Sequence, residues 1–218
     1  MDQPVSPRPR RGCLFYGCFT GIVCLVAILV AFLLGLHQLR GMVNGYTDAQ
    51  PTPLPTVHLS APELDAVQRR LDGFIDAIRG GRPAPPLRLT ADEINALISV
   101  VPGAQPWRGK IFVIITNSVL KTQVSLPLAD LGLPLFRGRY LNGLGTVNVA
   151  LTNGILFAHL ESLSVKGKPV PTLYMNRMRE QNLATPINEN ASDSVALNRI
   201  QSVEVEGDAL VFTAKPVN

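Results

Sequence analysis

Few residues of this chain combine the types and spacing that catalysis requires. Of the three histidines, only His159 lies in a stretch long enough to fold as a domain. His159 and Glu161 are two residues apart in a predicted strand, so their side chains point to one side. We interpret the pair as a polar, solvated face rather than a general base and its partner. The chain also lacks HExxH and EF-hand patterns, so we expect no catalytic residue, metal or cofactor, and no enzyme.

A second group of candidates is basic and aromatic. Residues 136–140 read FRGRY and follow a proline in a predicted loop. Arg137, Arg139 and Tyr140 are of the types that contact lipid headgroups or anionic glycans. The simpler interpretation is a loop whose charges are solvated. We keep the three residues as candidate headgroup contacts.

The most unusual feature is a run of five apolar residues in a predicted strand: Ile111, Phe112, Val113, Ile114 and Ile115. A strand with one wet face alternates apolar and polar residues, so this run indicates a strand covered on both faces. We favour a central strand packed between the core and a helix. The alternative is that its second face contacts a membrane, an acyl chain or a partner. The five residues are therefore the candidate contact for an apolar ligand or partner protein.

The elements that position these candidates begin with an apolar segment. Residues 13–36 contain no charged residue and, as a helix, reach roughly 36 Å, enough to cross a ~30 Å hydrocarbon core. Three arginines precede this segment and only Arg40 follows closely, which predicts a cytoplasmic N-terminus and an extracytoplasmic C-terminal part. We expect a basic tail over 1–12 and an uncleaved single-pass anchor in the cell membrane over 13–38, rather than a cleaved signal peptide.

The charge of the chain is concentrated near this anchor. The formal net charge is +4, but four of the 20 basic residues and one of the 16 acidic residues lie in the first forty positions. The remaining part, with 16 basic and 15 acidic residues, is almost neutral and does not indicate nucleic-acid binding. Alternating prolines predict a semi-rigid stalk over 39–58. Residues 59–218 are then the extracytoplasmic domain.

Two capping boxes predict the first helices of this domain. Ser60 to Glu63 and Thr90 to Glu93 both combine a capping hydroxyl with a glutamate three residues later. Apolar residues follow at helical spacing up to about residues 80 and 101. A third helix is expected over 171–182, with its apolar residues on the buried side: Leu173, Met175 or Tyr174, and Met178.

From residue 110 the apolar period changes to two, which predicts antiparallel strands. Asn153-Gly154 predicts a hairpin, and a change of parity in the strand that follows predicts a bulge near Glu161–Ser162. The glycines of Gly143-Leu144-Gly145 lack the context of a phosphate loop, and we expect a turn there. A last hairpin is expected at 202–214. The predicted class is α+β: a mainly antiparallel, curved sheet packed by about three helices behind the transmembrane helix.

Two stretches resemble a known family. Residues 89–97 read LTADEINAL, and residues 142–171 contain an NG turn and close on GKPVP. This pattern is similar to the YpmS-like family of uncharacterised, membrane-anchored bacterial envelope proteins. The resemblance implies an N-terminal anchor and a curved sheet that can wrap a helix or an acyl chain. It carries over no catalytic residue.

Together these features predict a single-pass, membrane-anchored envelope protein whose domain is a non-enzymatic binding module. The expected ligand is a lipid or another apolar molecule. The alternative is a structural or scaffold protein that binds another envelope protein.

Overall fold

The computed structural model describes residues 25–26, 28–35, 37–38, 41, 43–130 and 136–216. The chain divides into two compact units, residues 1–45 and 46–218. In the first unit most described residues are helical and carry exposed apolar side chains: Leu25, Val26, Ile28, Leu29, Val30, Phe32, Leu33 and Leu34. The first half of the expected anchor and the tail before it lie outside the described residues. Within the described ranges, no helix has the length and apolar character needed to span a membrane.

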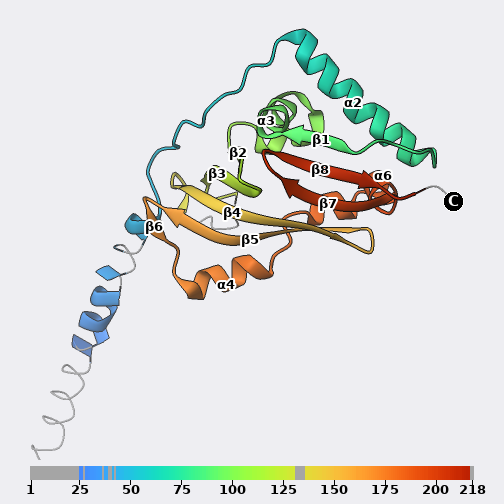
Figure 1. Ribbon diagram of the computed structural model, residues 1–218. Helices are drawn as coiled ribbons and strands as arrows, with labels where there is room; N and C mark the ends of the chain where they lie inside the picture. The colour runs from blue at the N-terminus through green and yellow to red at the C-terminus, as the bar shows by residue number, and fades with distance from the viewer. Residues whose placement is uncertain are drawn as a thin grey trace, which may run out of the picture. The chain divides into compact units, whose positions relative to one another are not determined.

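The strands of the second unit form two sheets in which every pairing is antiparallel (Figure 1). The larger sheet has the order β2-β3-β4-β5-β6, with β2 Ile111–Thr116, β3 Val119–Pro127, β4 Tyr140–Thr152, β5 Ile155–Val165 and β6 Lys168–Pro169. The smaller has the order β1-β8-β7, with β1 Leu87–Thr90, β7 Ile200–Glu206 and β8 Ala209–Ala214. The expected α+β class with antiparallel strands is confirmed, but the strands form two sheets rather than one.

The described helices are α2 Ala61–Arg79, α3 Ala91–Val100, the 3₁₀ helix η1 Pro102–Trp107, α4 Thr172–Glu180, α5 Thr185–Glu189 and α6 Ala191–Leu197. Both capping boxes are confirmed. On α4, Met175 is buried as expected, whereas Leu173 is 73% exposed. The expectation of about three helices omits α5 and α6, because helices this short carry too few turns to show an apolar period.

The tight turns follow the local sequence closely. Asn153 and Gly154 have φ angles of 52° and 76°, the left-handed values of a type I′ hairpin, which confirms the predicted turn. The pairing of β4 with β5 shifts between Thr146 and Val147, which leaves Glu161 unpaired and confirms the bulge. The turn expected at Gly143–Gly145 is wrong, because both glycines lie inside β4. A Cβ on Gly145 would lie 2.8 Å from Leu160 Cδ1, so this glycine permits a close approach of β5.

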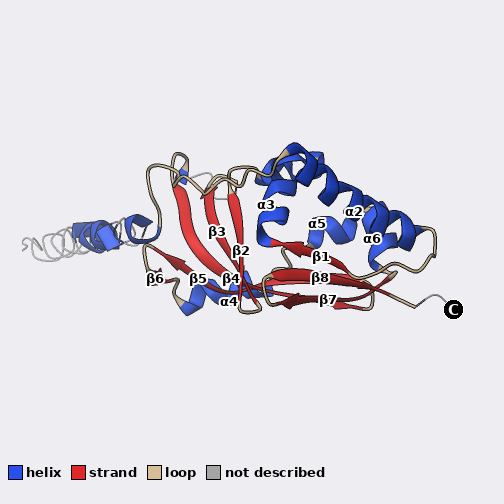
Figure 2. Ribbon diagram, turned by 45° about the horizontal axis from the view of Figure 1, so that its top comes forward, coloured by secondary structure: helices blue, strands red, loops and turns tan. Residues whose placement is uncertain are grey.

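Each sheet has its own hydrophobic core. The core of the smaller sheet is built with α2 and α6, which lie over one of its faces (Figure 2). The core of the larger sheet is built with α4, through Met175 and Met178. Val149, Leu151 and Leu156 of the larger sheet pack against the core of the smaller sheet, and two turns also join the sheets. Ser118 N donates to Gly207 O (2.8 Å) and Gly207 N donates to Ser118 Oγ (2.9 Å), and the tip of the β4–β5 hairpin at Gly154 touches Asn198.

The compact unit begins earlier than expected. The chain from Tyr46 onward already contacts the larger sheet: the Tyr46 hydroxyl donates to Pro169 O (3.4 Å), and Asp48 forms a β-bridge with Tyr140. The stalk expected over residues 39–58 therefore overlaps the start of the domain. Thr47 and Asp48 bond to the larger sheet through their side chains, and Gln50 and Thr52 bond to it through their backbone. A free stalk would make these bonds to water, so they extend the domain toward the N-terminus.

Candidate functional site

The apolar run Ile111–Ile115 forms most of β2, which lies at the edge of the larger sheet. Ile115 is buried and the other four residues are half-buried. The favoured interpretation as a central strand is therefore wrong. A helix residue covers the free edge instead: Asn95 Nδ2 donates to Val113 O, and Val113 N donates to Asn95 Oδ1, both at 2.8 Å. One amide side chain thus replaces a neighbouring strand at the centre of the run.

A shallow hollow of about 300 Å³ lies beside this run. Its walls are Phe112, Val113, Ile114 and Ile115 on one side, and Thr90, Ala91, Asp92 and Asp208 on the other. Two carboxylates therefore face the apolar strand. A neutral apolar ligand fits this chemistry poorly and an anionic lipid fits it worse, because each carboxylate would have to lose water or repel the ligand. The run is therefore less suitable for an apolar ligand than the crevice described below.

The three candidate headgroup contacts do not form one free surface. Arg139 donates from Nε to Thr47 Oγ1 (2.6 Å) and from Nη2 to Thr47 O (3.2 Å). The backbone of Tyr140 is bonded to Asp48 in both directions (2.8 and 2.9 Å). Only Arg137 is exposed. Arg139 and Tyr140 therefore hold the start of the domain against the sheet.

The contacts of residues 47–52 form a polar seam on the larger sheet. We define the seam by eight residues: Thr47, Asp48, Gln50, Thr52, Ser125, Arg139, Asn142 and Lys166. Buried Asn142 is at its centre. Its Nδ2 donates to Asp48 Oδ2 and Gln50 O (both 2.9 Å), and its Oδ1 accepts from Ser125 Oγ (2.8 Å) and Thr52 N (3.1 Å).

The seam also contains a charge pair. Lys166 Nζ lies 2.8 Å from Asp48 Oδ1. Hydrogen bonds from Lys166 and Asn142 lower the pKa of the Asp48 carboxyl below its usual range. Among the described residues, every buried side-chain nitrogen or oxygen has a hydrogen-bond partner. The seam is therefore a satisfied structural network.

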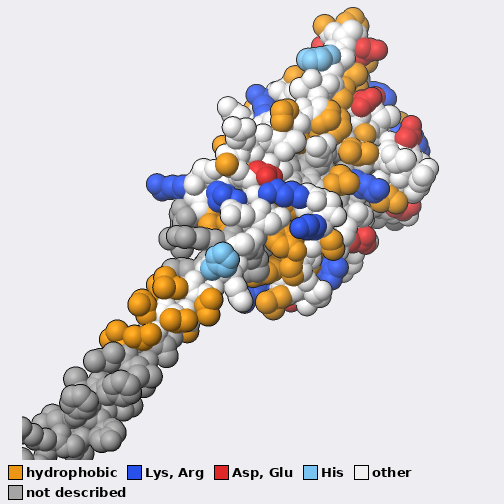
Figure 3. Space-filling model, turned by 90° about the vertical axis from the view of Figure 1, so that its left-hand side faces the viewer, with side chains coloured by type: hydrophobic (Ala, Val, Ile, Leu, Met, Phe, Trp, Pro, Cys, Tyr) orange, Lys and Arg blue, Asp and Glu red, His pale blue; other side chains and the backbone are white. Residues whose placement is uncertain are grey.

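The same end of the larger sheet is rich in basic residues. Antiparallel pairing brings five of them to this end: Lys110, Arg137, Arg139, Lys166 and Lys168. Viewed from the side of β6, Lys and Arg side chains form a band across the domain (Figure 3). Lys110 is paired with Asp130 (2.8 Å) and Lys166 with Asp48, so part of this charge is neutralised within the fold.

His159 and Glu161 have structural contacts. His159 Nδ1 lies 2.9 Å from Arg179 O, and the Arg179 guanidinium donates twice to Glu161 O (2.8 and 3.0 Å). These bonds attach α4 to β5. Over the described part of the chain, no three His, Cys, Asp or Glu side chains gather as metal ligands.

An apolar crevice of about 170 Å³, which no motif in the sequence indicates, lies between α2 and the smaller sheet. Eleven of its twelve lining residues are apolar: Leu71, Phe74, Ile75, Ile78, Leu87, Leu89, Ile187, Ala196, Leu197, Ile200 and Phe212, with Arg79 at the rim. An apolar cavity of about 150 Å³ is large enough to bind benzene. The crevice therefore has room for a short apolar group, such as the end of an acyl chain.

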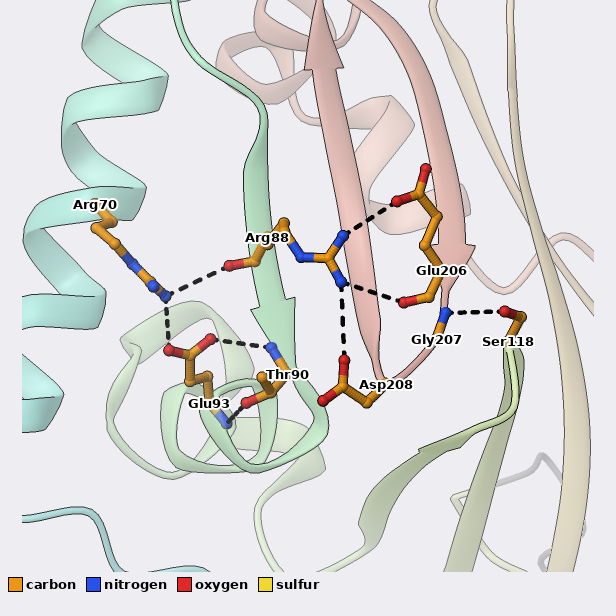
Figure 4. Close-up of polar contacts among 8 residues, drawn as sticks. All are labelled: Arg70, Arg88, Thr90, Glu93, Ser118, Glu206, Gly207 and Asp208. Atoms are coloured by element: carbon orange, nitrogen blue, oxygen red, sulfur yellow. Dashed lines mark hydrogen bonds and ion pairs between the residues drawn. The ribbon is translucent and has the colours of Figure 1, made fainter.

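Two arginines near α2 and the smaller sheet form ion pairs, and one of these pairs attaches α2 to α3 (Figure 4). Arg70 on α2 pairs with Glu93 (2.7 Å), whose other carboxylate oxygen accepts from Thr90 N (3.0 Å). Arg88 on β1 pairs with Glu206 (3.1 Å) and approaches Asp208 (3.8 Å). Each of these two arginines has an acidic partner, so this side of the smaller sheet is locally neutral.

Comparison of the chain with protein-family models, curated proteins and solved structures found no match. The resemblance to the YpmS-like family therefore stays a proposal, and the functional argument depends on the geometry described above.

Proposed function

We propose that this chain is a single-pass, membrane-anchored envelope protein whose domain binds lipid or another apolar ligand without catalysis. The observation that carries the proposal is the apolar crevice between α2 and the smaller sheet. Apolar interiors are normally packed to the density of organic crystals, with few voids larger than a water molecule. The crevice of about 170 Å³ opens to the surface, and its eleven apolar lining residues surround space that close packing would fill. It is the surface best suited to burying an apolar group from water.

The opening of the crevice supports a ligand that enters from the surface. Ile187 of α5 lines the crevice and is 44% exposed, whereas Phe74 and Ile78 of α2 are buried at its inner wall. An apolar chain that enters beside Ile187 would exchange contact with water for contact with leucine, isoleucine and phenylalanine side chains. This exchange is favourable by roughly 25 cal/mol per Å² of apolar surface buried.

The membrane anchor is part of the same proposal. The uncharged run 13–36, the exposed apolar side chains in its described part and the arginines before it support a single-pass anchor with a cytoplasmic N-terminus. The folded unit starts at Tyr46, so few residues of the chain separate it from this run. Exposed Arg137 is then the best-placed member of the FRGRY segment to contact headgroups.

The crevice can be tested by filling it. Ala196 on α6 is buried in the crevice wall, while the adjacent Val195 is 58% exposed. We expect the Tm of the full-length chain in amphipol to rise saturably with 1-decanol, because a ligand that binds only the folded state stabilises it. Ala196→Phe should abolish this rise, and Val195→Phe should preserve it. If a folded A196F variant responds like wild type, the proposed site is wrong. Ala196→Leu provides a smaller filling variant if A196F does not fold.

A second candidate function is binding to another envelope protein. It is supported by α4, where Leu173 and Tyr174 are 73% and 44% exposed. Large exposed apolar side chains that lie side by side are typical of protein interfaces. Leu173→Glu should then weaken capture of a partner and leave the response to 1-decanol unchanged. A loss of the decanol response in L173E would contradict the separation of these two functions.

A further inference from the structure

A basic hollow adjoins the apolar crevice. Its volume is about 440 Å³, and its lining includes Arg82, Arg199 and Lys215. Ile78 lines both spaces, and the pairs Leu197–Asn198 and Arg199–Ile200 each place one residue in the crevice wall and the next in the hollow. The two spaces therefore lie next to each other, with Ile78 in the wall of both. One is apolar and the other is cationic.

Three separate elements bring the cations together. Arg82 follows the end of α2, Arg199 precedes β7 and Lys215 follows β8. Lys215 N donates to Arg199 O (2.9 Å), so these two residues are backbone neighbours across the sheet.

The two guanidinium groups approach the end of α2 at neighbouring glycines. A Cβ on Gly80 would lie 3.3 Å from Arg82 Nε, and a Cβ on Gly81 would lie 3.8 Å from Arg199 Nη1. The side chains of both arginines therefore reach the Gly80–Gly81 turn, beside the mouth of the crevice.

These cations have no acidic partner in the part of the chain that the structure describes. None of the ion pairs there includes Arg82, Arg199 or Lys215, and no carboxylate lines the hollow. By contrast, Arg70 on α2 and Arg88 on β1, which do not line the hollow, are both paired with carboxylates (Figure 4). Like charges on neighbouring strands repel one another. An anion in the hollow would remove this repulsion.

We propose that the hollow binds the anionic head of an amphiphile whose apolar tail enters the crevice. This inference depends on the proposed function, and it adds the ligand class: a single acyl or alkyl chain that carries a carboxylate or phosphate. Guanidinium groups bind both anions through paired N–H donors, and Lys215 adds a further positive charge. Near the hollow, the carbonyls of Asp76, Ile78 and Ala77 at the end of α2 accept bonds from Gly80 N, Gly81 N and Arg82 N (3.0, 3.1 and 2.8 Å).

The test compares ligands that share a tail and differ in the head. The full-length chain in amphipol is titrated at pH 8 with 1-decanol, decanoate and decyl phosphate. We expect both anions to bind roughly tenfold more tightly than the alcohol, in the range of a hydrogen bond to a charged group. The ratio of the dissociation constants of decanoate and decyl phosphate shows which anionic head the site prefers. Inorganic phosphate serves as a probe without a tail, and it should compete only weakly with decanoate and decyl phosphate.

Matched variants separate this inference from the proposed function. Arg199→Gln should remove the preference for the anions and leave 1-decanol binding unchanged. Arg177→Gln, at an exposed position on α4, should behave like wild type. If wild type binds the alcohol and the anions equally, or if R199Q keeps the preference, the head site is wrong and the apolar site stands. If wild type binds none of the three ligands, both proposals fail.

Discussion

The polar seam and the apolar crevice lie on different sheets of one domain and are built in opposite ways. In the seam, buried Asn142 and Ser125 bond to each other and to residues 48–52, and Lys166 is paired with Asp48. At the crevice, α2 leaves apolar space against the smaller sheet, and three cations at its mouth have no acidic partner among the described residues.

This difference separates a structural region from a binding region. A fully satisfied polar network fixes one arrangement, because every alternative leaves a buried group without a partner. Open apolar space and unpaired like charges reduce stability. Features that reduce stability locally are common where a ligand completes the structure. We therefore assign the seam to fixing the start of the domain and the crevice to binding.

We expect the largest loss of stability from a substitution in the seam. Asn142→Ala removes the partner of several buried groups and should lower the free energy of unfolding by about 2–3 kcal/mol. Asn148→Ala is the control, because Asn148 is exposed and its side chain bonds only to Glu161 (3.1 Å). Urea unfolding of the full-length variants measures both. Equal effects in N142A and N148A would show that the seam is not a special source of stability.

The second predicted effect is an increase in the free energy of unfolding. Ala196→Phe adds apolar surface to the crevice and should raise the free energy of unfolding by about 1 kcal/mol, as cavity-filling substitutions commonly do. The same substitution that abolishes decanol binding should therefore stabilise the protein without ligand. Thermal unfolding detects this gain. A196F would instead be destabilised if the crevice were already closely packed.

A smaller effect distinguishes paired from unpaired arginines. Arg88→Gln removes the ion pair with Glu206 and should destabilise the domain by roughly 0.5 kcal/mol. Arg199→Gln relieves repulsion with Lys215 and should stabilise the domain by roughly a few tenths of a kcal/mol. Both changes in the free energy of unfolding should become smaller at high salt, because salt screens exposed charges. Equal signs for the two substitutions at low salt would contradict the assignment of an unpaired cluster at the crevice mouth.

The smallest effect is the response of the seam to acid. Because the pKa of Asp48 is lowered in the folded state, its contribution to stability is complete above about pH 4 and is lost as the pH falls through the lowered pKa. Amide exchange of residues 47–52 should therefore accelerate as the pH falls below about 4, relative to the intrinsic rate of the free peptide. The pKa of Glu63 is also lowered, by hydrogen bonds from Ser60, so acid should loosen the start of α2 as well.

Asp48→Asn provides the control for this acid response. The variant should show weaker protection of residues 47–52 at neutral pH and little further change on acidification. The start of α2 should keep the wild-type response, because Glu63 is unchanged. If residues 47–52 of D48N lose protection over the same pH range as wild type, another group is responsible.

Local features of the fold were predictable because their signals lie within a few residues. The capping boxes at Ser60 and Thr90 each need a hydroxyl and a glutamate three positions apart. The hairpin at Asn153 needs one dipeptide. The bulge at Glu161 needs only a change of parity within one strand. In each case the physical cause and its sequence signal occupy the same short segment.

Long-range features were not predictable from one sequence. Nothing beside Val113 indicates that Asn95 would cover the edge of β2, because the two residues belong to different elements. Nothing in residues 47–52 indicates their buried partners on β3 and β4. The crevice walls come from α2, α5, α6 and three strands. The apolar stripe of α2 has the same pattern whether it packs tightly or leaves space for a ligand.

The most direct test of the central claim is to locate a bound apolar ligand. The full-length chain is irradiated with a decanol analogue that carries a diazirine at the end of its chain, and the labelled peptides are mapped by mass spectrometry. We expect labelling of residues 71–79 and 187–200 that excess unlabelled 1-decanol displaces and that Ala196→Phe removes. Displaceable labelling confined to Ile111–Ile115, or none in the domain, would contradict it.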